Sequence, residues 1–129
     1  MSGKALVDTN VVIALFAGEP NTTGYLNKCS ELFLCVPVLG ELWYGALASS
    51  RIKENLQRVQ GFAKTVLVLS CDPATTAWYG EVKVSLRKKG RLIPDNDIWI
   101  AAIARQHKLK VLSRDSHFTE VDGLDVEIL

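Results

Sequence analysis

With 129 residues, the chain is long enough for one domain with a buried core but too short for two, and we place that single domain at 1–129. Its composition, 48% hydrophobic and 22% charged, is that of a soluble globular protein, and a net charge of +1 does not by itself indicate a nucleic-acid partner. The longest apolar run, 98–104, is far shorter than the roughly 20 residues of a membrane span, and the first residues lack the features of a secretory signal, so we expect a cytoplasmic protein.

Apolar runs alternate with helical patterns along the chain, which indicates an α/β fold with a mainly parallel sheet. The runs predict five strands, at 4–7, 31–36, 66–70, 111–112 and 126–129. We expect 66–70 to be a central strand because its apolar run is uninterrupted. The patterns predict six helices, at 11–16, 21–30, 37–48, 51–63, 73–89 and 97–107. The order of the strands is left open.

Several helix ends carry their own signals. Asn21 is the expected N-cap of the second helix, and Pro37 suits the first position of the third. Asp72 should open the fifth helix and Gly90 should close it. Asp95 is the expected N-cap of the sixth helix.

The three cysteines are an odd number without a C-x-x-C pair, which argues against a disulfide framework or a zinc site. Cys35 and Cys71 stand at the ends of apolar runs. We expect both to be small buried hydrophobic residues.

The helix that begins at Pro37 combines an apolar stripe with a single charge. The stripe, expected to be buried, has the spacing of one helix face and consists of Leu39, Leu42, Trp43, Ala46 and Leu47. Glu41 is the only charged residue from 37 to 48, so we expect its carboxylate to be neutralised, paired or bound to a metal. The alternative is a Glu41 that faces solvent through a narrow stripe formed by Tyr44, Gly45 and Ala48.

Three further acids occupy positions where chemistry is expected. Asp8 and Asp115 each follow a predicted strand, and ligands of open α/β sheets bind beyond the carboxyl ends of the strands. Each could instead be a turn residue or a helix cap. Asp97 precedes the apolar run 98–104, where the helix dipole also favours an acid. Because Asp95 is the better cap candidate, Asp97 is left for another role.

Gathering these acids would require a positive charge among them. Carboxylates about 4 Å apart repel by roughly 4 kcal/mol per pair at an effective dielectric near 20. Hard divalent cations with oxygen ligands, Mg²⁺ or Mn²⁺, would fit such a site, whereas zinc would require His or Cys ligands. The residues alone do not establish that the four acids converge.

The ordered set of motifs resembles the PIN-domain nuclease family, and within it the VapC-type toxins of bacterial toxin–antitoxin pairs. The resemblance extends over nearly the whole chain and rests on 7–10 (VDTN), 40–42 (GEL), 97–102 (DIWIAA) and 113–118 (SRDSHF). Ser113 stands where the family more often has Thr, and both residues carry a hydroxyl. The resemblance implies a three-layer α/β/α sandwich around a mainly parallel sheet. It also implies a metal and catalytic site formed by Asp8, Glu41, Asp97 and Asp115, supported by Asn10 and Ser113.

The resemblance further implies an endoribonuclease in which one or two Mg²⁺ or Mn²⁺ ions activate water. Such toxins form homodimers and are blocked by a VapB-type antitoxin whose C-terminal segment enters the acidic groove. The aromatic residues that could line an interface, although we expect them mainly in the core, are Trp43, Tyr44, Trp78 and Tyr79.

Four basic residues within five positions give a candidate RNA-contacting cluster, formed by Arg87, Lys88, Lys89 and Arg91. A solvated helix end, with positive charges near the negative pole of the helix dipole, explains the same cluster equally well.

Other chemistries fit less well. An aspartyl-phosphate phosphatase would need a second Asp two residues after Asp8, where this chain has Asn10. A phospho-receiver domain has paired acids near its first strand, and these are missing here. A non-catalytic PIN-like module that binds RNA or protein would lack one of the four acids, and all four are present. The sequence therefore favours a metal-dependent endoribonuclease, with the non-catalytic module as the alternative.

Overall fold

The computed structural model describes residues 3–129. Its strands are β1 (Lys4–Val7), β2 (Glu31–Cys35), β3 (Leu67–Leu69), β4 (Lys110–Ser113) and β5 (Val126–Ile128). Its α-helices are α1 (Thr9–Phe16), α2 (Pro20–Asn27), α3 (Val36–Leu47), α4 (Ile52–Ala63), α5 (Pro73–Lys88) and α6 (Asp95–His107), and a 3₁₀ turn, η1, spans Ser116–Glu120. Among residues 3–129, no helix is both long enough and apolar enough to cross a bilayer.

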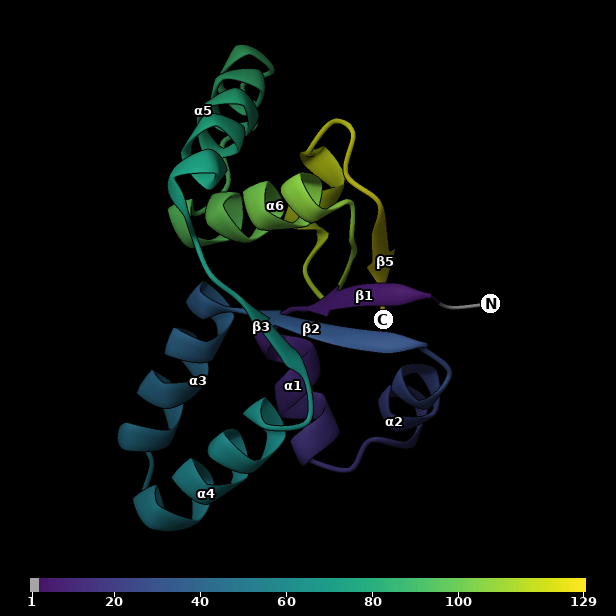
Figure 1. The fold of residues 1–129 in the computed structure, drawn as a ribbon, viewed down its shortest axis with the longest axis vertical. Coiled ribbons are helices and arrows are strands. Elements are labelled where there is room, and N and C mark those ends of the chain that lie inside the picture. The colour runs from purple at the N-terminus through teal and green to yellow at the C-terminus, as the bar shows by residue number, and fades with distance from the viewer. Residues whose placement is uncertain (1–2) are drawn as a thin grey trace.

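The strands form one sheet in the order β3-β2-β1-β4-β5, and every neighbouring pair is parallel. From β1 the chain moves to β2 and β3 on one side, then crosses back to β4 and β5 on the other. Parallel crossovers are right-handed, so this reversal puts α1 to α4 on one face and α5 and α6 on the other. Figure 1 shows this arrangement, which confirms the predicted three-layer α/β/α fold.

The core lies between the central strands and the helices that cover them. In β1, Leu6 and Val7 are fully buried, and in α6 the run 100–104 is buried on every face. Because this stretch is buried on every face, the seven consecutive apolar residues 98–104 were a reliable signal for the helix. Cys35 is buried as expected, whereas Cys71 is exposed, so that expectation was wrong.

The expectation that 66–70 forms a central strand was wrong. β3 pairs only with β2 and is an edge strand. Leu67 is 53% exposed and Val68 is 38% exposed. An uninterrupted apolar run identifies a strand but not the number of its neighbours, and at this edge side chains on both faces of the run are open to solvent.

The stripe predicted for α3 is only partly buried. Leu42 and Ala46 lie in the core, but Trp43 and Leu47 are exposed, and Tyr44 is 75% exposed. Neighbouring elements cover one side of α3 and leave its outer side open, so the apolar pattern was wider than the buried face. The prediction that Trp43 and Tyr44 pack in the core was therefore wrong.

Two of the expected helix caps were also wrong. Asn21 lies inside α2, which begins with Pro20; Glu19 holds the N-cap position without a side-chain hydrogen bond. Asp95 is the first residue of α6 rather than its cap, and the cap position is held by Pro94. In α2 the N-cap lies two residues before Asn21, because Pro20 takes the first helical position. In α6 the N-cap lies one residue before Asp95.

The ends of α5 agree with expectation. The Asp72 carboxylate accepts a hydrogen bond from the backbone N–H of Thr75, and the Thr75 hydroxyl accepts one from the backbone N–H of Asp72, which completes a capping box. After the helix, Gly90 has a φ of 68°, a conformation that glycine adopts without strain.

The contrast between a central and an edge strand predicts different costs for the same substitution. Leu34→Ala in the buried centre of β2 should lower the free energy of unfolding by about 2–5 kcal/mol, because it leaves a cavity. Leu67→Ala on the half-exposed edge strand should cost less than about 1 kcal/mol. Urea unfolding of both variants measures the difference, and equal costs would contradict the assignment of β3 to the edge.

Candidate metal centre

The candidate site lies where the chain reverses its direction across the sheet. β1 and β4 are neighbours, but the crossovers that connect them to the rest of the sheet run over opposite faces. At such a point the carboxyl ends of the two strands leave a crevice, which is where open α/β sheets bind ligands. Asp8 directly follows β1 and Asp115 lies two residues beyond β4. α6 contributes Asp97 from one layer and α3 contributes Glu41 from the other.

Asp8 is the buried acid of the crevice, with 5% of its surface exposed. Its Oδ1 accepts a hydrogen bond from the backbone N–H of Thr9 at 2.8 Å, which caps α1, and its Oδ2 accepts one from the Ser113 hydroxyl at 2.7 Å. Burial raises the pKa of Asp8 to about 6, and the negative charges of Asp97 and Glu41 act in the same direction. The two hydrogen bonds oppose this rise but do not cancel it.

Ser113 and Asn10 fasten the ends of the two strands together. The fully buried Ser113 hydroxyl donates to Asp8 and accepts a hydrogen bond from the backbone N–H of Asp115 at 2.9 Å. Asn10 accepts one from the backbone N–H of Arg114 at 3.1 Å, and its side-chain amide lies 3.5 Å from the Ser113 hydroxyl. A single hydroxyl therefore links the carboxylate after β1 to the backbone after β4.

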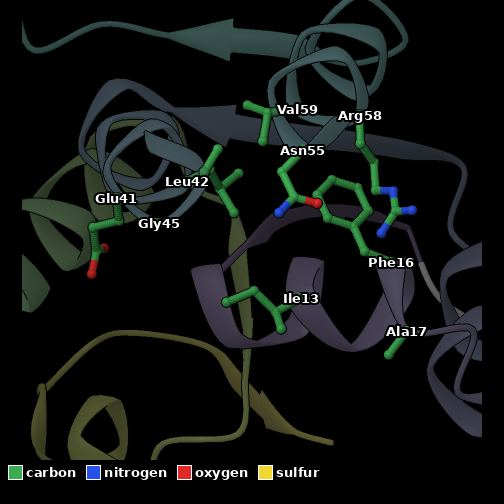
Figure 2. Close-up of a pocket in the computed structure, with 10 residues that line it drawn as sticks. Ile13, Phe16, Ala17, Glu41, Leu42, Gly45, Asn55, Arg58 and Val59 are labelled. Atoms are coloured by element: carbon green, nitrogen blue, oxygen red, sulfur yellow. The ribbon is translucent and has the colours of Figure 1, made fainter. Parts of the chain in front are cut away.

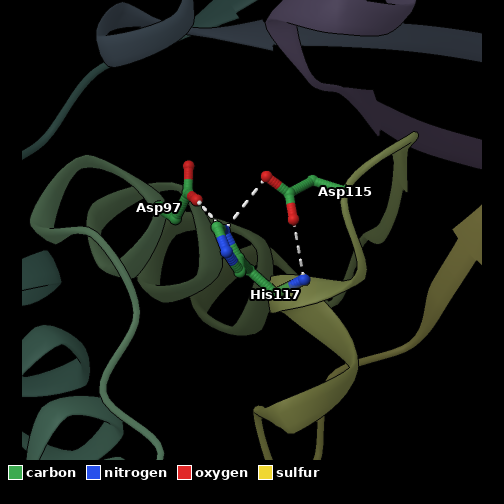
Figure 3. Close-up of side chains that lie close together, drawn as sticks. All are labelled: Asp97, Asp115 and His117. Atoms are coloured by element: carbon green, nitrogen blue, oxygen red, sulfur yellow. Dashed lines mark hydrogen bonds and ion pairs between the residues drawn. The ribbon is translucent and has the colours of Figure 1, made fainter.

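Figure 3 shows the second part of the site, where an imidazole lies between two carboxylates. His117 Nδ1 is 3.1 Å from Oδ2 of Asp97 and 3.0 Å from Oδ2 of Asp115. The other oxygen of Asp115 accepts a hydrogen bond from the backbone N–H of His117 at 2.9 Å and caps the 3₁₀ turn. Burial raises the pKa of Asp97, the hydrogen bond with His117 lowers it, and the charge of Asp115 raises it further.

Glu41 approaches Asp8 from the opposite layer, and its side chain is exposed. The open outer side of α3, described above, is the reason. Tyr44, Gly45 and Ala48 are exposed on the same helix, as the solvent-facing alternative predicts, and a metal-binding role for Glu41 stays a prediction. The Thr9 hydroxyl donates a hydrogen bond to Glu41 Oε1 at 3.0 Å, which ties this carboxylate to the residue after Asp8.

The four acids are linked through hydrogen bonds and charge near the carboxyl ends of β1 and β4, but they do not form one tight cluster. Among the described residues, the group of three potential ligands whose donor atoms lie within 4.8 Å of one another is Asp97, Asp115 and His117. Asp8 and Glu41 lie outside this group, and the charge of Asp8 is coupled to those of Asp97 and Glu41. Carboxylate oxygens dominate this donor set, which suits a hard divalent cation. Sequence reasoning did not assign Thr9 and His117 to the site, although His117 follows Asp115 by two residues.

Asp95 belongs to a different surface from its neighbour Asp97. Its carboxylate accepts a hydrogen bond from the Tyr79 hydroxyl at 2.6 Å and one from Lys83 Nζ at 3.1 Å. The hydrogen bonds from Tyr79 and Lys83 lower the pKa of Asp95. Tyr79 in turn stacks on Trp99, with ring centroids 4.0 Å apart.

An apolar cavity of about 350 Å³ opens beside Glu41, between α1, α3 and α4. Figure 2 shows Glu41 near one end of this groove, with Phe16 and Arg58 toward the other. The walls between them are mainly apolar, with Ile13 and Leu42 among the lining residues.

The members of the basic cluster at the end of α5 differ in their contacts with the rest of the protein. Lys89 Nζ donates to the Glu120 carbonyl at 2.6 Å and to Asp122 Oδ1 at 3.1 Å, so this side chain holds α5 to the segment after β4. Arg87, Lys88 and Arg91 are exposed. The C-terminal end of α5, which carries this cluster, points away from the sheet (Figure 1).

The fold and the crevice define a PIN domain. Residues 5–124 match the PIN domain family, so the chain belongs to that family, as its motifs indicated. It is similar to Ribonuclease VapC2 of Haemophilus influenzae, with 31% identity over 127 residues and 96% of each chain covered. It is also similar to the tRNA(fMet)-specific endonuclease VapC of Shigella flexneri, with 29% identity over 127 residues and the same coverage.

Solved structures agree with this assignment. The structure of DNA-bound VapBC from Salmonella typhimurium aligns with a TM-score of 0.88 and 26% identity, covering 99% of this chain and 98% of that one. VapBC2 of Rickettsia felis, bound to a DNA fragment from its promoter, aligns with a TM-score of 0.89 and 98% coverage of both chains. At 22% identity the second likeness concerns the fold alone.

The raised pKa of Asp8 predicts how the metal-free protein responds to pH. Because the folded pKa, about 6, lies above the ordinary 3.8, ionised Asp8 destabilises the fold. The stability that protonated Asp8 gives the folded state is fully present below pH 3.8 and is lost as the pH rises through about 6. In EDTA, Asp8→Asn should therefore be more stable than wild type at pH 7.5, by up to about 3 kcal/mol, and the gain should vanish near pH 4.

Thermal unfolding at the two pH values measures this gain. Asp95→Asn is the matched control and should change stability in the opposite direction at pH 7.5, because the pKa of Asp95 is lowered rather than raised. An Asp8→Asn variant no more stable than wild type at pH 7.5 would contradict the account of the buried carboxylate.

Proposed function

We propose that this PIN domain is a Mg²⁺- or Mn²⁺-dependent endoribonuclease, a VapC-type toxin that hydrolyses phosphodiester bonds in RNA. The observation that carries the proposal is the buried Asp8 carboxylate, whose pKa is raised by burial and by the charges of Asp97 and Glu41. A fold that holds these charges together is suited to a cation. Relatives named ribonuclease and endonuclease VapC, matched over nearly their whole length, support the same activity.

In this proposal Asp8 and Asp97 are the central ligands, and Glu41 and Asp115 complete the acidic site. Bound divalent ions would supply Lewis acidity toward water and toward the phosphate charge. Ser113 and Thr9 fix the orientation of the Asp8 carboxylate through the hydrogen bonds described above. The exposed carboxylate of Glu41 is accessible to a water molecule at the mouth of the crevice.

We also propose a VapB-type antitoxin as the protein partner and a homodimer as the oligomeric state. Solved VapBC structures align with nearly the whole chain. The apolar groove that ends at Glu41 would accept an apolar segment, and a cationic side chain at the end of that segment would meet the acids. The exposed apolar side chains of α3, Trp43, Tyr44 and Leu47, supply surface for an interface between subunits.

RNA would approach over basic side chains that have no competing task. Arg87, Lys88 and Arg91 meet this condition better than Lys89, which is held by Glu120 and Asp122. The candidate phosphate-contacting set is therefore Arg87, Lys88 and Arg91, with Lys89 as a member that would first have to leave its present partners.

Removing one carboxylate at a time tests the proposed activity. Asp97→Asn should reduce Mg²⁺-dependent cleavage of RNA by more than about 100-fold, because a ligand is lost. Asp95→Asn, two residues earlier on the same helix, should cleave at nearly the wild-type rate, because its side chain faces Tyr79 and Lys83. A fluorogenic RNA substrate gives both rates. Undiminished cleavage by the wild type in EDTA would overturn the metal assignment.

The salt dependence of RNA binding tests the basic cluster. In a cleavage-deficient Asp97→Asn background, Lys88→Ala should reduce the slope of log affinity against log salt by about 1, since one phosphate contact is lost. Lys89→Ala should chiefly lower the melting temperature, because it removes the contacts with Glu120 and Asp122. An unchanged slope for Lys88→Ala would exclude Lys88 as a phosphate contact.

A further inference from the structure

We propose that His117 is a nitrogen ligand of the metal site, acting with Asp97 and Asp115, and that it biases the site toward Mn²⁺ over Mg²⁺. This inference rests on the proposed function, since it requires a divalent ion in the crevice. It adds a residue of a different chemical kind to the four acids.

The separations of the three donor atoms match those of neighbouring ligands around one ion. In an octahedral complex with bonds near 2.1 Å, adjacent ligand atoms are about 3.0 Å apart. His117 Nδ1 is 3.0 Å from Asp115 Oδ2 and 3.1 Å from Asp97 Oδ2. One potential donor atom from each of the three residues lies within 4.8 Å of the others. Little rearrangement is needed for these atoms to share an ion.

The imidazole is placed by the main chain. The Asp115 carboxylate accepts the backbone N–H of His117 through Oδ1 and so caps η1, which leaves Oδ2 facing the ring. The next residue, Phe118, is fully buried and anchors the turn in the core. The position of His117 therefore follows from the same turn that positions Asp115. Figure 3 shows the ring directed at both carboxylates.

The same distances also allow a second arrangement, in which a protonated His117 is a counter-ion for the two carboxylates. A counter-ion and a metal compete for the carboxylates, whereas a ligand and a metal bind together. Removal of His117 would then strengthen metal binding in the counter-ion arrangement and weaken it in the ligand arrangement. The two arrangements make opposite predictions.

A nitrogen ligand also changes which ion the site prefers. Mg²⁺ takes oxygen ligands almost exclusively, while imidazole is a good ligand for first-row transition ions. Replacing the imidazole by an amide oxygen should weaken Mn²⁺ binding more than Mg²⁺ binding. The ratio of the two affinities is therefore the quantity that reports on His117.

The experiment uses Mn²⁺ as the bound ion and as the spectroscopic probe. The metal-free chain is loaded with one equivalent of Mn²⁺, and electron spin echo envelope modulation is recorded to detect nitrogen bound to the ion. We expect a ¹⁴N signal from the wild type and its loss in His117→Gln. Titration should show Mn²⁺ affinity reduced by about 10-fold in that variant, with a smaller change for Mg²⁺ measured by competition.

His107 supplies the matched control, because the chain has only two histidines and His107 is exposed at the end of α6. His107→Gln should keep the ¹⁴N signal, which then comes from His117 alone. This variant leaves the inference testable even where His117→Gln does not fold. Circular dichroism confirms the fold of both variants.

The outcomes separate this inference from the function on which it rests. Bound Mn²⁺ without a ¹⁴N signal, or tighter Mn²⁺ binding by His117→Gln, overturns the role of His117 and leaves the acidic metal site intact. The metal site itself is overturned if the wild-type chain binds no Mn²⁺. It is also overturned if the Asp97→Asn variant binds Mn²⁺ as tightly as the wild type does.

Discussion

Burial of a carboxylate among other carboxylates is the constraint on which the site depends. Asp8 follows the central strand β1 at the point where the chain reverses across the sheet, so burial comes with its position in the fold. Asp97 and Glu41 arrive from opposite layers and add like charge. Two hydrogen bonds offset the cost of ionising Asp8 only in part, so a cation bound among the acids would stabilise the ionised carboxylate.

The supporting contacts show how the fold sustains this arrangement. Ser113 is a buried hydroxyl that both donates to Asp8 and accepts from the backbone of Asp115, so one side chain coordinates the ends of two strands. Asn10 secures the same junction from α1. These contacts hold the acids through short segments next to regular elements rather than through long loops, which favours a preorganised site.

Much of the fold was predictable because its signals are local. The strands after which Asp8 and Asp115 lie, the capping box of α5 and the apolar run 98–104 of α6 can each be predicted from neighbouring residues. The predictions that failed concern how much of each helix or strand is covered by other elements. The apolar run at β3 did not reveal an edge strand, and the apolar surface of α3 did not reveal that Glu41 and Tyr44 face solvent. The pairing of His117 with Asp97 depends on tertiary contacts between η1 and α6, which no short motif specifies.

The central claim is that the acids converge because a divalent ion is held among them. The most direct measurement is a crystal structure grown with Mn²⁺ and phased to locate anomalous scatterers. The account predicts an anomalous peak in the crevice, in contact with Asp8 and Asp97. Well-ordered carboxylates with no peak among them, at a Mn²⁺ concentration that saturates known sites of this kind, would contradict it.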